Sequence, residues 1–206
     1  MVILTRQTED DGTVEYPIDP AAIIKALAIV VPAKSGFIAP GANIISVESN
    51  GTSTKIIAYR PPQITGIWLE GSQTALRVPM PPLIMKMSLP GRSATVCALA
   101  HPPKGENDLI YGTPLANVGS SGWVCWGSVS VPQVENNDLG PVWDTFFGTR
   151  FANHSVGQKS KKHPDDIRAM LIELHDRQAE KYPVHDLVAT MQGSKQMTIK
   201  DMIEEG

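Results

Sequence analysis

The chain has 206 residues, of which 42% are hydrophobic and 19% are charged, a composition that is ordinary for a globular protein with its own core. Its formal net charge of −3 argues against a surface built mainly to bind phosphates, so no nucleic-acid partner is expected. The dense basic run Lys159–Lys162 is interpreted as a solvated loop.

The two cysteines, Cys97 and Cys125, are too few for a disulfide framework. No apolar run reaches the roughly 18 residues that a membrane span needs. The first residues, MVILTRQTEDDG, combine a short apolar stretch with early acids, which is untypical of a signal peptide. These features predict a protein of the reducing cytoplasm, without membrane contact, in which thiols stay reduced.

Residues 17–31 predict a short N-terminal helix, with Asp19 as its cap and Pro20 at its first position. The next strands are marked by alternating apolar residues and turn formers. A hairpin is expected at Asn50-Gly51, and further strand pairs are expected around residues 71 and 90–91. Together these strands predict an antiparallel meander of about five or six strands over residues 43–100.

Residues 101–140 show little periodicity and many turn formers, so a long loop is expected there, and such loops often carry function. Helical patterns return afterwards, in a short segment at 140–152 and in the clearest helix of the chain at 163–182. Pro164 is expected to open that second helix, and an apolar stripe follows at 167, 170, 171 and 174. A final short helix is expected within 198–206. The order predicts an α+β fold with helices segregated against an antiparallel sheet.

Metal and nucleotide motifs are absent from the sequence. The five histidines show no i, i+4 pair and neither cysteine lies in a C-x-x-C, so zinc spacing is missing. The phosphate-binding and dinucleotide-binding glycine motifs and the G-x-S-x-G motif are also missing. Neither a metal nor an organic cofactor is therefore expected.

The two thiols remain as the candidates for chemistry. Cys97 lies in the apolar run ATVCALA and is expected to be a buried structural residue. Cys125 follows a polar turn in GSSGWVCWG, at a loop position that would give a nucleophilic thiol the access it needs. The residues alone leave a second interpretation open, in which Trp123 and Trp126 anchor a short exposed strand and the thiol is structural.

The stretch TPLANVGSSGWVCWG resembles the ubiquitin-conjugating-enzyme (UBC) superfamily, and more closely its bacterial branch, which includes PRTRC system protein B and the prokaryotic UBC-like family D. Members carry an Asn-[Ile/Val] pair eight residues before the catalytic cysteine and a glycine three residues before it. Asn117-Val118, Gly122 and Cys125 match that spacing. Pro81-Pro82 and the segment W-TFFGTRFANH add support, and the resemblance covers roughly residues 36–155.

One position departs from the eukaryotic pattern. Those members carry His-Pro-Asn where this chain has Leu115-Ala116-Asn117. The histidine is mainly structural in the family, so its replacement removes no catalytic group but leaves open how the asparagine turn is held.

The resemblance implies a UBC-like fold with an N-terminal helix, a meander, a long active-site loop and C-terminal helices. It implies one domain over residues 1–182, with a core at about 17–160, followed by a polar extension at 183–206 that is able to form a short helix. Trp123, Trp126, Phe146 and Phe147 are interpreted as core or loop anchors, of which an exposed subset would suit protein docking.

The resemblance also implies a chemistry. Cys125 would accept a ubiquitin-like protein from an adenylating enzyme as a thioester, then pass it to an acceptor. Asn117 would donate to the oxyanion or hold the loop that does, against a simpler role as a turn residue. His154 would deprotonate the attacking nucleophile, or is a surface or capping histidine. Asp138 or Asp144 would orient an incoming amine.

The implied partners are the ubiquitin-like modifier, the adenylating enzyme and, as a further candidate, an operon-encoded deconjugating peptidase. Two alternatives stay open at this point. One is a catalytically silent UBC-like binding module in which Cys125 is structural, and the other is a thiol hydrolase that uses Cys125 with His154.

Overall fold

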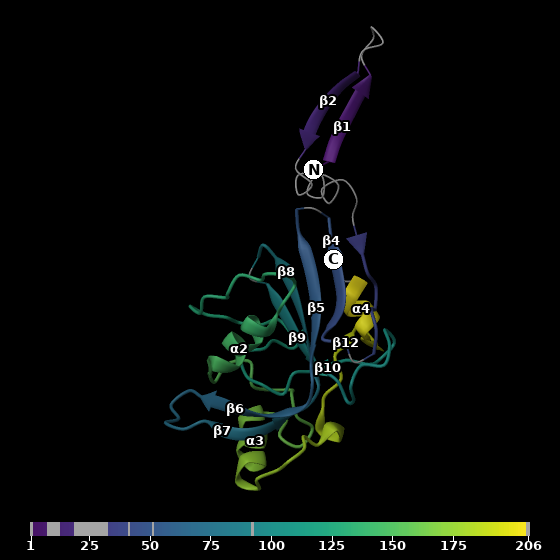
Figure 1. Cartoon of the computed structure of the whole chain (residues 1–206). Helices are drawn as coiled ribbons and strands as arrows, with labels where there is room; N and C mark the ends of the chain where they lie inside the picture. Colours follow the sequence, from purple (N-terminus) through teal and green to yellow (C-terminus); the bar gives the residue numbers. More distant parts are fainter. Residues whose placement is uncertain are drawn as a thin grey trace.

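The computed structural model describes residues 2–7, 13–18, 33–40, 42–50, 52–91 and 93–204, with backbone alone for 2–7, 13–18 and 33 (Figure 1). Its strands are β1 (Val2–Gln7), β2 (Thr13–Ile18), β3 (Ala33–Lys34), β4 (Ile44–Ser49), β5 (Thr54–Arg60), β6 (Gln63–Leu69), β7 (Leu76–Met80), β8 (Leu83–Leu89), β9 (Ala94–Ala98), β10 (Tyr111–Gly112), β11 (Arg150–Phe151), β12 (Met191–Gln192) and β13 (Lys195–Gln196). Its helices are α2 (Gly140–Gly148), α3 (Ile167–Asp176), the short 3-10 helix η1 (Val184–Asp186) and α4 (Ile199–Glu204).

The largest sheet has six strands in the order β10-β9-β8-β5-β4-β3, and all its neighbours are antiparallel. The predicted hairpin at Asn50 is confirmed in the pairing of β4 with β5. The Asn50 side-chain oxygen accepts hydrogen bonds from the backbone N–H groups of Thr52 (3.1 Å) and Ser53 (2.8 Å), which closes the turn. The predicted pair β8–β9 is confirmed as well.

The expected single meander is wrong, because the hairpin of β6 and β7 leaves the main sheet. β5 pairs directly with β8, from Thr54 opposite Leu89 to Arg60 opposite Leu83. β6 and β7 instead form a second sheet, in which β11 lies parallel to β6. Proline pairs at 61–62 and 81–82 bracket this hairpin, and a proline has no N–H to continue a ladder.

The main sheet is covered on both faces (Figure 1). Along β5, Ile56 and Ala58 enter a core with α2, α3 and the second sheet, while the alternate Ile57 enters a core with the C-terminal segment. Ile199 and Met202 of α4 are fully buried in that second core. The end of the described chain around residues 197–202 therefore packs on the chain's own sheet, and the predicted short terminal helix is present as α4.

Two of the other predicted helices are present in the structure, and one of them begins later than expected. α2 is confirmed, and the predicted stripe of α3 is buried at 167, 170, 171 and 174. α3 begins later than expected, because the extended Asp166 caps it by accepting from Arg168 N–H at 2.9 Å, so Pro164 lies outside the helix. The predicted N-terminal helix at 17–31 is wrong for residues 17 and 18, which belong to β2, and its remaining residues lie outside the described part of the chain. Among the described residues, no helix is long and apolar enough to cross a membrane.

Candidate functional site

The segment from Asn117 to Cys125 forms a tight turn between antiparallel backbones. Val118 bridges to Val124, and the two hydrogen bonds beside this bridge run from Cys125 N–H to Asn117 O (2.8 Å) and from Gly119 N–H to Trp123 O (2.7 Å). The eight-residue spacing of the sequence motif is therefore the spacing that places Asn117 directly against the backbone of Cys125.

The turn is also fixed to the strand β9. Val96 N–H donates to Gly122 O (2.8 Å), and Val124 N–H donates to Ala94 O (2.9 Å). Gly122 has φ +85°, and a Cβ at this position would lie 2.8 Å from both Thr95 Cγ2 and Val96 O. Only glycine fits such a conformation at such a distance from a neighbouring strand, which explains the glycine of the motif.

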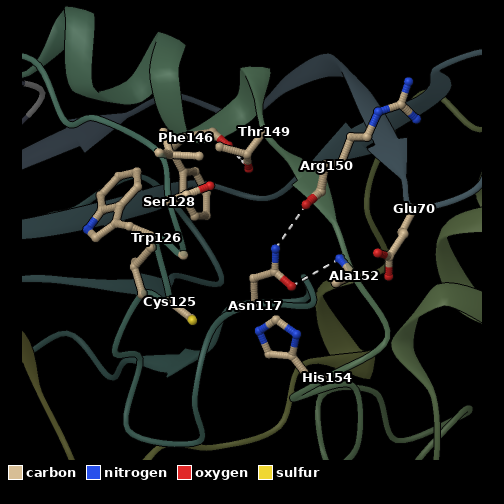
Figure 2. Close-up of a pocket in the computed structure, with 13 residues that line it drawn as sticks. Glu70, Asn117, Cys125, Trp126, Ser128, Phe146, Thr149, Arg150, Ala152 and His154 are labelled. Carbon is tan, nitrogen blue, oxygen red and sulfur yellow. Dashed lines mark hydrogen bonds between the residues drawn. The ribbon is translucent and has the colours of Figure 1, made fainter.

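Asn117 ties the turn to a third part of the chain. Its φ of 59° lies in the left-handed region, which asparagine tolerates. Its side-chain amide donates to Arg150 O (3.0 Å) and accepts from Ala152 N–H (3.0 Å), so both amide atoms bond the backbone around β11 (Figure 2). Its own N–H donates to His154 O (3.3 Å). Asn117 thus joins the segment after α2 to the cysteine turn.

Cys125, Asn117 and His154 line one cavity of about 370 Å³. The Cys125 side chain is partly exposed there, whereas Cys97 is 1% exposed in β9. In Figure 2 the His154 ring lies below Asn117 and the Cys125 sulfur lies to its left. The structure therefore brings together the three residues that the sequence selected, and it gives solvent access to Cys125 and none to Cys97.

Aromatic side chains support the far wall of this cavity. Trp126 packs edge to face on Phe146, with ring centroids 6.1 Å apart, and Phe146 packs in the same way on Phe151 at 5.6 Å. Trp126, Phe146 and Phe147 are buried, as expected of anchors, but Trp123 is 53% exposed. The position after the cysteine is thereby held rigidly, while the indole two positions before it faces solvent.

The interpretation of Lys159–Lys162 as a solvated loop is wrong for its first half. Lys159 is 3% exposed and Ser160 is buried as well, while Lys161 and Lys162 face solvent. The Lys159 ammonium donates to Val118 O in the cysteine turn. Burial lowers the pKa of Lys159 to about 8, and the nearby Cys97 sulfur opposes that shift. Charge runs predict exposure on average, and this lysine is the exception because it reaches a backbone acceptor.

Two acidic candidates of the sequence lie elsewhere. Neither Asp138 nor Asp144, both in the described part of the chain, lines the cavity of Cys125. Asp138 accepts from Gly140 N–H (2.8 Å) at the start of α2, and Asp144 lies near the Arg60 guanidinium. The carboxylate that does line the cavity belongs to Glu70, at the end of β6. No sequence signal could have selected Glu70, because it reaches the cavity through the parallel pairing of β11 with β6.

The described residues contain no cluster of three or more His, Cys, Asp or Glu side chains that could hold a metal ion.

The comparison with known families decides the class of the protein. Residues 22–190 match the family model described as prokaryotic E2 family D. The chain belongs to this family. No curated protein and no solved structure matches it.

Membership of the prokaryotic E2 family places the chain among ubiquitin-like-protein conjugating proteins, a class that works with a ubiquitin-like protein and an activating enzyme. The mixed structure of antiparallel sheets and few helices is compatible with an E2-like fold. The match spans the whole turn from Asn117 to Cys125 and the segment that holds it.

Proposed function

We propose that this family member carries a ubiquitin-like protein as a thioester on Cys125 and transfers it to an acceptor. One observation supports this most strongly: the partly exposed Cys125 thiol lines a cavity with Asn117 and His154, at the end of a turn that three parts of the chain fix. A thiol that receives a large protein substrate must be accessible and held still, and both conditions are met here.

The transfer has two covalent steps. The Cys125 thiolate attacks the activated C-terminal carbonyl carbon of the modifier, forming a C–S bond while the bond to the activating group breaks. An acceptor nucleophile then attacks the thioester carbonyl, forms its own bond to that carbon and releases the Cys125 thiolate. The proton lost by the acceptor needs a base, and the exposed His154 imidazole at the cavity is the candidate for that role.

Asn117 acts mainly by holding the turn in this proposal. Its amide already bonds Arg150 O and Ala152 N–H, so its contribution to transfer comes through the position of the Cys125 backbone. Glu70 faces the same cavity and would attract a cationic acceptor such as a lysine side chain. It takes over the role that the sequence suggested for Asp138 or Asp144.

The decisive experiment incubates the protein with a prokaryotic ubiquitin-like protein, its adenylating enzyme and ATP, followed by gels with and without reductant. We expect an adduct that reductant removes, that Cys125→Ala abolishes and that Cys97→Ala retains. Asn117→Ala should still form this adduct and should discharge it about 10- to 100-fold more slowly, because the turn loses its bonds to Arg150 O and Ala152 N–H. This loss is smaller than the about 10²–10³ in rate that removal of a direct oxyanion donor costs.

The other outcomes identify the alternatives. Binding of the modifier without any adduct would make the protein a silent binding module. Hydrolysis of a simple ester without ATP, lost in both Cys125→Ala and His154→Ala, would make it a thiol hydrolase. An unchanged discharge rate in Asn117→Ala would show that the bonds of Asn117 to Arg150 O and Ala152 N–H have no effect on transfer.

A further inference from the structure

A buried lysine reaches the cysteine turn from the segment that follows β11. Lys159 is 3% exposed, and its ammonium donates to the carbonyl of Val118, the residue next to Asn117. In the sequence, Lys159 lies more than thirty positions after Cys125 and is not next to any residue of the cysteine motif.

Burial of a lysine costs desolvation free energy unless its ammonium finds a hydrogen-bond acceptor or an opposite charge. Removing an ammonium from water costs more free energy than a single hydrogen bond from that ammonium returns. An apolar side chain of similar volume would fill the same space without that cost. The pKa of Lys159, lowered to about 8 by burial, still leaves the amine mostly charged at neutral pH. The hydrogen bond to Val118 O offsets part of the cost of burying this charge.

The Val118 carbonyl is the group that the turn itself leaves without a partner. The two hydrogen bonds beside the Val118–Val124 bridge use Asn117 O and Gly119 N–H, so the Val118 carbonyl points to the other side. Leu115 and Ala116 are fully buried and have no polar side-chain atoms with which to hold the turn. Lys159 supplies the missing donor, and a buried carbonyl without a partner would otherwise destabilise the turn.

The segment that carries Lys159 is itself fixed. Gln158 N–H donates to Pro164 O (2.6 Å), Lys161 N–H donates to Asp186 O (3.0 Å), and His163 N–H donates to Ser160 Oγ (2.9 Å). These bonds hold the backbone on both sides of Lys159, so the lysine is delivered to the turn from an ordered support.

We propose that Lys159 is a positioning residue, which fixes the Val118 carbonyl and thereby the orientation of Asn117 and Cys125. Its contribution to transfer rests on the function proposed above, whereas its effect on the turn does not.

The test compares Lys159→Met with Lys86→Met. Methionine has nearly the length of lysine but no donor. Lys86 is a matched control, because its ammonium also donates to a backbone carbonyl, Met202 O at 3.0 Å, which lies in α4 and not in the cysteine turn. The first measurement is hydrogen exchange of the Cys125 amide, whose donation to Asn117 O reports on the turn, relative to the amides of β5.

We expect the Cys125 amide to exchange about tenfold faster in Lys159→Met after normalisation to β5, and to stay unchanged in Lys86→Met. The second measurement is the thioester. Lys159→Met should load Cys125 at the normal rate and discharge it about tenfold more slowly, while Lys86→Met does neither. Normal amide protection together with normal discharge in Lys159→Met would overturn the proposal.

Two arrangements keep the result clear. If Lys159→Met does not fold, NMR of the unmodified protein with ¹⁵N-labelled lysine decides: the Lys159 ammonium hydrogens should exchange slowly with water, and fast exchange like that of surface lysines would overturn the proposal. If the unmodified protein forms no thioester, the proposed function fails, but amide exchange in Lys159→Met still tests the role of Lys159 in the turn.

Discussion

The surroundings of the two cysteines differ in nearly every respect, although both belong to one structural unit. Cys97 lies inside β9, between β8 and β10, and is 1% exposed. Cys125 lies at the end of an irregular turn and lines an open cavity. Yet hydrogen bonds of Val96 and Val124 fix the turn to β9. The strand that contains Cys97 therefore supports the turn that exposes Cys125.

The accessibility of the Cys125 thiol and the rigidity of its turn therefore come from separate parts of the chain. The irregular turn exposes the thiol, and the regular strand next to it keeps the turn in place. Gly122 is the point of contact, since its Cβ position would lie 3.1 Å from the Cys97 sulfur. Thiol reactivity and Gly122→Ala test this contrast directly, and Lys159 and Glu70 test the groups around the exposed thiol.

The largest expected effect is in thiol reactivity. In the folded protein, iodoacetamide should modify Cys125 on the order of 10³-fold faster than Cys97, because Cys97 must wait for an opening of the sheet. Mass spectrometry of tryptic peptides over time measures both rates. In urea the two rates should become similar, and similar rates without urea would contradict the contrast.

Gly122→Ala should destabilise the protein by about 3 kcal/mol. The new Cβ meets Thr95 and Val96 at 2.8 Å and must also adopt φ +85°. Gly193→Ala is the matched control, because Gly193 has φ +62° but nothing lies within 4 Å of its Cβ position. Strain alone should cost that variant about 1 kcal/mol. Urea unfolding measures both, and equal losses would show that the approach to β9 is unimportant.

Stability should depend on pH through Lys159. The folded-state pKa of about 8 lies below the ordinary value of 10.5, so between these values the unfolded chain binds more protons and the free energy of unfolding rises with pH. From pH 7.5 to 9.5 this contribution is about 2 kcal/mol. Urea unfolding at both pH values should show the rise in the parent protein but not in Lys159→Met, and the difference between them cancels the other groups. A rise of equal size in both proteins would remove Lys159 as its source.

The smallest expected effect concerns the acid at the cavity. Glu70→Gln should slow discharge of the thioester to a free amine about threefold, since it removes a carboxylate that lines the Cys125 cavity. Asp144→Asn, at an exposed acid on α2 outside that cavity, should leave discharge unchanged. The reverse pattern would restore Asp144, one of the two acids that the resemblance suggested for this role.

Local patterns in the sequence were sufficient for several elements. The hairpin at Asn50, the buried stripe of α3 and the short α4 each depend on residues within about one element, where turn chemistry and periodicity act. The spacing of Asn117, Gly122 and Cys125 is local too, because all three lie in one turn of nine residues. The start of α3 was missed because the conformation of Asp166, not the position of Pro164, decides where that helix begins.

The residues of the cysteine turn and the buried stripe of α3 could therefore be predicted from the sequence. The three-dimensional fold was needed to show that β5 pairs with β8, that Glu70 lines the cavity of Cys125, and that Lys159 is buried against Val118. The physical reason is the same in each case. These contacts join segments that are far apart in the chain, so their energies depend on which surfaces meet in space, and no pattern of neighbouring residues carries that information.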